Sequence, residues 1–132
     1  MCRLFAINAA PERIRATFWL LDASDSFISQ SRSNPDGTGL GYFDENDVPI
    51  VDKQPLAAFQ DQAFLREAKQ ISSTVVISHV RFATAGKLTL ENCHPFEMDN
   101  RLFAHNGAIG GLERLEAKLG SEPIAIGVRV AA

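Results

Sequence analysis

A cysteine directly follows the initiator methionine of this chain. Removal of Met1, which a residue as small as Cys2 favours, would leave a thiol and a free α-amino group on one residue. Because such an amino group has a pKa of about 7.7–8.0, part of it is neutral near pH 7 and can take the thiol proton. Cys2 would then be a nucleophile that carries its own base. The alternative is a small apolar residue that opens a buried strand.

Arg81 and Thr84 stand just beyond the strongest strand signal of the chain, where a loop would leave the edge of a sheet. The planar guanidinium of an arginine matches a carboxylate with two parallel hydrogen bonds, and a threonine hydroxyl adds another donor. The pair therefore predicts a site for the α-carboxylate of an amino-acid substrate. The structural alternative is a surface ion pair of Arg81 and a turn capped by Thr84.

The run His105-Asn106-Gly107 ends a short apolar segment at a glycine. An asparagine amide and a neighbouring backbone N–H can converge on one oxygen, as an oxyanion hole requires, and one such donor is typically worth about 3–4 kcal/mol in the transition state. The alternative is an ordinary Asn-Gly hairpin turn.

Four side chains could instead ligate a metal ion, namely His79, Cys93, His94 and His105. Cys93 and His94 are adjacent, however, and the sequence contains no Cys-x-x-Cys or His-x-x-x-His pair, which argues against a zinc site. We expect no metal and no cofactor, and we interpret His79 and His94 as hydrogen-bonded structural histidines that shape a pocket. A small metal-binding module on Cys93 and the histidines remains as an alternative.

The composition is that of one globular domain. The 132 residues are 45% hydrophobic and 22% charged, with a net charge of -3, and no basic stripe appears. We therefore expect no nucleic acid partner and no membrane partner. No signal peptide precedes the first strand, and two cysteines do not form a disulfide framework, so we expect a cytoplasmic protein with reduced thiols.

Short hydrophobic segments separated by turn signals predict a mixture of strands and helices. The expected strands span 2–8, 39–43, 48–53, 74–80 and 102–106, and the expected helices span 60–70 and 111–119. We expect the strand at 2–8 to be buried on both faces and residues 44–47 to form a hairpin loop. A further helix should begin at Pro11, with Ile14, Phe18 and Leu21 on one face.

Glycines crowd the segment before and within the predicted strand 39–43. Pro35-Asp36-Gly37 predicts a turn, because proline presets φ and glycine tolerates positive φ. The glycines that follow allow the backbone to approach another strand or a ligand closely.

Five short motifs, taken in order, resemble the class II glutamine amidotransferases, which are N-terminal nucleophile hydrolases. The resemblance covers Cys2 to about Gly120 and is greatest to the stand-alone bacterial type, which includes γ-glutamyl amidohydrolases such as that of ergothioneine biosynthesis. The motifs are Met1-Cys2, Asp36-Gly37-Thr38-Gly39-Leu40-Gly41, His79-Val80-Arg81-Phe82-Ala83-Thr84, Asn92-Cys93-His94-Pro95-Phe96 and His105-Asn106-Gly107.

The resemblance implies a role for each matching residue. Cys2 would be the catalytic nucleophile, and Asn106 and Gly107 would stabilise the tetrahedral oxyanion. The implied substrate-binding residues are Arg81, Phe82, Thr84 and His105. The implied fold is α+β, the αββα sandwich of N-terminal nucleophile hydrolases, incomplete at its C-terminus.

The C-terminal stretch departs from the family pattern. Family members continue with a Gly-Asp-Thr-Asp-Ser-Glu-like motif whose aspartate binds the substrate α-amino group, whereas residues 121–132 contain no aspartate. We therefore expect residues 1–132 to form the N-terminal portion of a class II glutamine amidotransferase-type domain that is truncated at its C-terminus.

Two functions follow from these patterns. The first is hydrolysis of the side-chain amide of glutamine or a γ-glutamyl compound through a Cys2 thioester, with hydrolysis favoured over ammonia transfer because these residues include no synthase domain. The alternative is a catalytically inactive remnant or a partner-dependent subunit. Such a chain could form a homo-oligomer that covers an open sheet edge.

Overall fold

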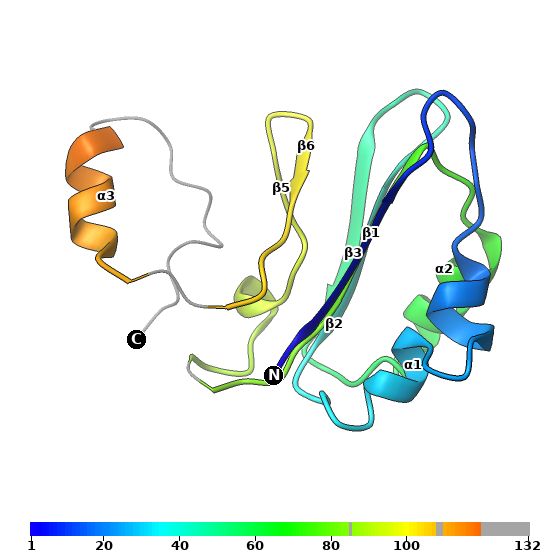
Figure 1. The fold of residues 1–132 in the computed structure, drawn as a ribbon, viewed down its shortest axis with the longest axis horizontal. Helices are drawn as coiled ribbons and strands as arrows, with labels where there is room; N and C mark the ends of the chain where they lie inside the picture. The colour runs from blue at the N-terminus through cyan, green and yellow to red at the C-terminus, as the bar shows by residue number, and fades with distance from the viewer. Residues whose placement is uncertain (85, 108–109, 120–132) are drawn as a thin grey trace.

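A four-stranded antiparallel sheet organises the molecule (Figure 1). The computed structural model describes residues 1–84, 86–107 and 110–119. The strand order is β1-β4-β2-β3, so that β1 and β3 form the edges of this sheet. The bounds are Arg3–Asn8 for β1, Thr38–Phe43 for β2, Pro49–Gln54 for β3 and Val75–Val80 for β4.

Helical segments cover one face of this sheet and enclose the apolar core (Figure 1). They are η1 (Phe18–Asp22), α1 (Phe27–Gln30) and α2 (Gln62–Gln70). Alternate strand residues such as Leu40, Val76 and Val80 point into this core, as the two-residue period of a strand requires. The core therefore anchors the sheet from one side and leaves the opposite face for other elements.

The opposite face of the sheet receives the segment that follows β4. That segment contains η2 (Leu90–Asn92) and the hairpin of β5 (Phe96–Met98) and β6 (Arg101–Phe103), and α3 (Leu112–Leu119) comes after it. The predicted close approach of the glycines is confirmed here. A Cβ at Gly39 would lie 2.0 Å from the His94 carbonyl oxygen, and one at Gly41 would lie 2.8 Å from the Pro95 ring.

Several predicted elements are confirmed. The strand at 74–80 is β4, the helix at 60–70 is α2, and 111–119 contains α3. The predicted hairpin joins β2 to β3, although its loop runs one residue further, to Val48. The Asp44 carboxylate accepts from the Asn46 and Val48 N–H groups at 2.8 and 2.9 Å, and these bonds hold the longer loop.

The prediction that the first strand is buried on both faces was wrong. Among the described residues, β1 pairs with β4 alone, and its residues alternate between half-buried and exposed positions. Phe5 and Ile7 pack against the helical core, whereas Leu4 on the other face is 38% exposed. The apolar sequence of this strand therefore does not mean burial, because an edge strand here has only one packed face.

The helix predicted from Pro11 was also wrong. Ile14 instead forms a bridge with Ser73, and helical structure begins at Phe18, whose side chain is 59% exposed. Arg13 donates hydrogen bonds to the carbonyls of Phe43, Asp44 and Ser72. These tertiary contacts hold the segment extended and override the local helical spacing.

Two further observations complete the fold. The strand predicted at 102–106 is shorter, because β6 ends at Phe103. In the described part of the chain, the helices are all too short or too polar to cross a membrane. The stretch predicted to depart from the family, 121–132, lies outside the described residues.

Candidate active site

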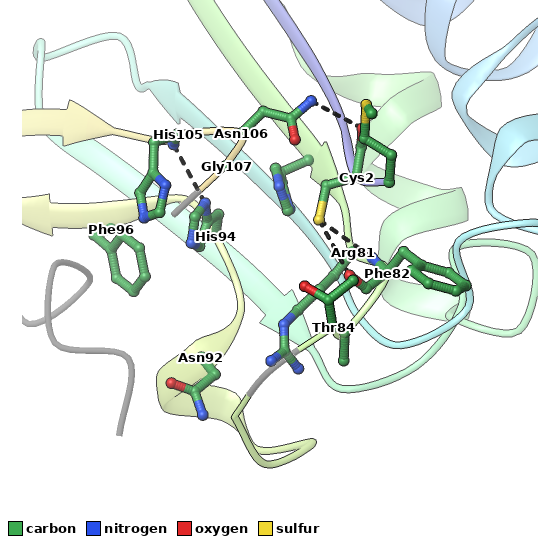
Figure 2. Close-up of a pocket in the computed structure, with 13 residues that line it drawn as sticks. Cys2, Arg81, Phe82, Thr84, Asn92, His94, Phe96, His105, Asn106 and Gly107 are labelled. Carbon is green, nitrogen blue, oxygen red and sulfur yellow. Dashed lines mark hydrogen bonds between the residues drawn. The ribbon is translucent and has the colours of Figure 1, made fainter. Parts of the chain in front are cut away.

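The structure brings every predicted site residue to one cavity of about 320 Å³ (Figure 2). The cavity lies where the N-terminus, the end of β4 and the segment after β6 meet. Its lining comprises Met1, Cys2, His79, Arg81, Phe82, Ala83, Thr84, Asn92, His94, Phe96, His105, Asn106 and Gly107. Residues as distant in the sequence as Cys2 and Gly107 therefore meet in one place.

The Cys2 thiol is half-buried at this cavity and lies beside the backbone of Phe82. The Phe82 N–H donates to Cys2 Sγ at 3.3 Å, and Sγ lies 3.5 Å from the Phe82 carbonyl oxygen (Figure 2). A thiol can donate to that carbonyl, whereas a thiolate can only accept from the N–H. The Phe82 backbone, through its N–H and its carbonyl, can therefore hold the sulfur in either protonation state.

The segment at Asp36 and Gly37 pairs with the loop that leaves β4 and fixes it. The Arg81 N–H donates to the Gly37 carbonyl at 2.8 Å, and the Asp36 N–H donates to the Arg81 carbonyl at 3.0 Å. The Asp36 carboxylate then accepts from the Ala83 N–H at 2.8 Å. The predicted turn at Pro35-Asp36-Gly37 is only a bend at Asp36, without a positive φ at Gly37, and this segment pairs with the loop that presents Phe82 to the Cys2 sulfur.

Arg81 and Thr84, the predicted carboxylate-binding pair, differ in exposure. Arg81 is only 7% exposed and donates through Nη1 to the Lys87 carbonyl at 3.2 Å. Thr84 is exposed, and Phe82 between them is 41% exposed. The buried arginine is therefore a fixed cation in the wall, and the exposed hydroxyl lies closer to solvent.

The Asn106 side chain contacts the backbone of Cys2. Its Nδ2 donates to the Cys2 carbonyl oxygen at 2.9 Å (Figure 2). Gly107 follows with φ +129°, a conformation that favours glycine over any residue with a Cβ. The turn that carries the predicted oxyanion donors is thus joined directly to the N-terminal strand.

The rings of three histidines in the cavity lining pack against one another. The ring centroids of His79 and His94 are 4.4 Å apart, and those of His94 and His105 are 4.5 Å apart. Burial, together with the neighbouring positive or ionisable groups, lowers the pKa of His79 to about 4 and that of His94 to about 3. The imidazoles of His79 and His94 are therefore neutral at physiological pH.

The prediction that both buried histidines are hydrogen-bonded holds only for His94. His94 Nδ1 accepts from the His105 backbone N–H at 3.3 Å. Neither ring nitrogen of His79 has a hydrogen-bond partner in the described part of the chain, although its side chain is only 2% exposed. Ring packing against His94 and burial within β4, not hydrogen bonding, hold His79.

The second cysteine lies outside the cavity lining. Cys93 is 1% exposed, and burial raises the pKa of its thiol. Its Sγ lies 3.4 Å from the carbonyls of Gln54 and Thr89 and would contact a Cβ at Gly37. Within 1–84, 86–107 and 110–119, no three His, Cys, Asp or Glu side chains gather closely enough to hold a metal ion.

Some residues at the site were not predicted from the sequence. Met1, Ala83, Asn92 and Phe96 line the cavity, and Asp36 holds its loop. Asn92 and Phe96 flank Cys93-His94-Pro95 in the fourth motif, and that position was the available signal. The contact of Asp36 with Ala83 joins residues 47 positions apart and left no trace in local spacing.

The amino-acid sequence matches the family described as glutamine amidotransferases class-II over residues 1–125. The chain belongs to this family. A relative from Saccharomyces cerevisiae, named probable glutamine amidotransferase DUG3, is 32% identical over 135 residues, which cover 90% of this chain and 38% of the yeast protein. Human amidophosphoribosyltransferase is 31% identical over 90 residues, which cover 64% of this chain and 17% of the human protein.

A solved structure supports the same fold. The glutamine aminotransferase class-II domain protein from Silicibacter pomeroyi superposes with a TM-score of 0.53 at 22% identity, over 89% of this chain and 42% of that one. The α+β fold predicted from the sequence is confirmed, and the likeness is consistent with the N-terminal nucleophile hydrolase type. The chain thus spans less than half the length of the relatives it matches.

Proposed function

We propose that this protein hydrolyses the side-chain amide of glutamine or of a γ-glutamyl compound, with Cys2 as the nucleophile. The observation that carries the proposal is that the Cys2 thiol, Arg81 and the Asn106-Gly107 turn line one cavity. Membership of the class-II glutamine amidotransferases supports amide chemistry on glutamine. The cavity has room for a small amino-acid substrate, since ligand pockets start at about 300 Å³.

Met1, which also lines the cavity, would be removed before the reaction begins. The α-amino group of Cys2 would take the thiol proton, and Sγ would attack the amide carbon to give a tetrahedral intermediate. Collapse of this intermediate breaks the C–N bond, and the ammonium proton passes to the departing amine or ammonia. Water then attacks the thioester, regenerates the thiol and releases the γ-carboxylate.

Asn106 and Gly107 would stabilise the oxyanion of the tetrahedral intermediate. A side-chain amide has two N–H donors, and the Cys2 carbonyl accepts from Nδ2. The second N–H of Nδ2 and the Gly107 backbone N–H would point to the developing charge. The hydrogen bond holds the Asn106 amide against the backbone of Cys2, and this keeps the amide donor close to Sγ.

Arg81 would bind the α-carboxylate of the substrate, with the Thr84 hydroxyl as a second donor. Burial of Arg81 in the cavity wall strengthens such a charge-assisted bond, because little water competes for the guanidinium. Phe82 and His105 would line the path of the substrate chain between this end and the nucleophile. The substrate would thereby present its side-chain amide to Cys2.

The two cysteines provide a matched test of the nucleophile. Cys2→Ala should lower hydrolysis of glutamine, followed as glutamate release, by at least about 10³-fold, because the covalent route is lost. Cys93→Ala should retain hydrolysis, because this buried thiol lies outside the cavity lining. Equal activity of Cys2→Ala and the wild type would overturn the proposal.

Intact mass gives a second readout of the same proposal. A glutamine-like electrophile should add once to the wild type and to Cys93→Ala, after loss of the mass of Met1, and should not add to Cys2→Ala. An adduct on Cys93, or a chain that keeps Met1 and still reacts at Cys2, would contradict the N-terminal amine as base.

A further inference from the structure

The His94 imidazole lies at the junction of three parts of the site. It packs at a tilt against the rings of His79 of β4, Phe96 of β5 and His105, at 4.4, 4.5 and 4.5 Å between ring centroids. Its side chain is 9% exposed. The ring therefore cannot swing away without opening the packing between the sheet and the hairpin.

One edge of this ring makes a directional contact. Nδ1 accepts a hydrogen bond from the backbone N–H of His105 at 3.3 Å (Figure 2). A neutral imidazole has one accepting and one donating nitrogen, so this contact requires the tautomer with the proton on Nε2. Protonation of Nδ1 would replace the acceptor with a second donor facing the N–H.

The residue held by this contact directly precedes the proposed oxyanion turn. The pairing of β5 with β6 ends at Phe103, two residues before His105, so the ladder does not reach Asn106. Two hydrogen bonds anchor the turn, one from the His105 N–H to the His94 ring and one from the Asn106 side chain to the Cys2 carbonyl. Loss of either anchor would let the turn move relative to Sγ.

The backbone of His94 is fixed to the sheet in turn. Its carbonyl oxygen packs so closely on Gly39 of β2 that a Cβ there would lie 2.0 Å away. Lys53 of β3 donates to the preceding Cys93 carbonyl at 2.9 Å and lies 4.5 Å from the centre of the Phe96 ring. These contacts fix His94 relative to the sheet, and His94 in turn fixes the residue before the Asn106-Gly107 turn.

We propose that His94 is a positioning residue that holds the Asn106-Gly107 turn at the distance from Cys2 that oxyanion stabilisation requires. The proposal rests on the proposed amide hydrolysis and extends it to His94, which acts through the backbone of His105. The His79 ring supports His94 from the other side by packing alone. In the part of the chain that the structure describes, its nitrogens make no hydrogen bond. Burial beside His79, His105 and Lys53 keeps the His94 ring in its accepting form across physiological pH.

Two substitutions distinguish the role of the Nδ1 acceptor from that of ring packing. His94→Asn places a carbonyl oxygen near the position of Nδ1 and keeps an acceptor, whereas His94→Phe keeps the stacked ring and removes the acceptor. We expect His94→Phe to lower kcat for glutamine by about 10- to 100-fold with KM within about twofold, as loss of a transition-state interaction does. His94→Asn should recover most of that loss.

Phe103→Leu is the matched control, because Phe103 contacts the His105 ring at 5.8 Å but lies outside the cavity lining. It should leave kcat within about twofold of the wild type if the acceptor, and not general packing around His105, matters. Equal losses in His94→Phe and His94→Asn, or a loss in Phe103→Leu as large as in His94→Phe, would overturn the proposal.

A measurement on the wild type decides the same question without enzyme activity. Nitrogen NMR of the imidazoles should show His94 with an unprotonated Nδ1, and the His105 amide proton should exchange slowly. In His94→Phe the His105 amide should exchange faster, while amides of β4 keep their protection. A protonated Nδ1 or an unprotected His105 amide in the wild type would refute the positioning role, whereas an inactive chain with these signals intact would refute only the hydrolysis.

Discussion

Cys2 and Cys93 carry the same thiol in different surroundings. Cys2 lies half-buried in the cavity wall with the Phe82 N–H directed at its sulfur. Cys93 is enclosed between β3 and the Gly37 turn, and its burial raises the pKa of the thiol. The thiolate is the reactive form of a cysteine, so the buried Cys93 thiol is suited to packing and not to chemistry.

Arg81 allows a test of carboxylate binding at the level of one side chain. Arg81→Lys keeps the charge but loses the planar fork, so we expect KM for glutamine to rise about tenfold or more while kcat changes by less than about threefold. The reason is that the carboxylate is bound equally in the ground state and the transition state. Steady-state kinetics of Arg81→Lys and of the exposed control Arg101→Lys would measure this, and a fall in kcat at unchanged KM would contradict it.

Single residues were predicted well where a motif carried them and poorly where only the fold did. Cys2, Arg81, Asn106 and their neighbours were named from ordered motifs, and the structure places them in one cavity. Asp36 was recognised only as part of a turn, because its carboxylate reaches Ala83 across the sheet end. A contact between residues that are distant in the sequence has no local pattern to reveal it.

Among the elements, β2 shows how glycines on one face of a strand make room for the site. Gly39 faces the segment that carries His94, and a Cβ at this position would lie 2.0 Å from a backbone oxygen that cannot rotate away. We expect Gly39→Ala to lower the free energy of unfolding by about 2 kcal/mol or more, because the backbone must shift to relieve the contact. It should also reduce hydrolysis, since His94 moves with that segment.

The control for this prediction is Gly110→Ala, where a Cβ would meet no atom within 4 Å. Urea unfolding of both variants and the wild type gives the comparison. A Gly39→Ala variant as stable as Gly110→Ala would mean that the segment around His94 is not packed against β2 as described.

The start of α2 allows a second test at this scale. The Asp61 carboxylate accepts from the N–H groups of Ala63 and Phe64 at 3.0 and 3.2 Å and caps the helix, and the Asp61 side chain is 5% exposed. Asp61→Ala should cost about 1 kcal/mol of unfolding free energy, and Asp61→Asn, which keeps the accepting oxygen, should cost less. Thermal unfolding would measure both, and equal losses would show that the cap contributes nothing.

The elements also show where local patterns are insufficient. The β-branched run of β4 and the capped helix α2 were predicted because their local preferences agree with their places in the fold. The segment after Pro11 has helical spacing, yet the hydrogen bonds of Arg13 to three carbonyls and the bridge of Ile14 to Ser73 keep it extended. Such contacts depend on the position of β2 and β4, which the spacing of Ile14, Phe18 and Leu21 cannot report.

Across the whole molecule, the sheet separates stability from chemistry. One face of β4 supplies Val76 and Val80 to the helical core, and the intervening His79 faces the segment that builds the cavity. A one-residue shift of this strand would exchange the two sets and place an imidazole in the apolar core. The pairing of β4 with both β1 and β2 fixes the register and so fixes both faces together.

This separation predicts how stability depends on pH. The pKa of His79 is lowered from 6.5 to about 4 in the folded chain, mainly by burial, so the unfolded chain binds a proton that the folded chain excludes. The stability linked to the neutral His79 ring is fully present above pH 6.5 and is lost as pH falls toward 4. Between pH 7 and pH 5 this group alone should lower the free energy of unfolding by about 2 kcal/mol.

His79→Phe isolates this contribution, because it keeps a ring against His94 and removes the titrating nitrogens. Carboxylates also titrate toward the acid end of this range, so the quantity to compare is the difference between the two proteins at each pH. We expect urea unfolding to show a difference that grows in favour of His79→Phe from pH 7 to pH 5, since the variant loses no proton-linked stability at this position and no longer buries two unpartnered nitrogens. A difference that stays constant with pH would mean that the folded chain accommodates a charged His79, and the sheet would then not exclude charge from this face.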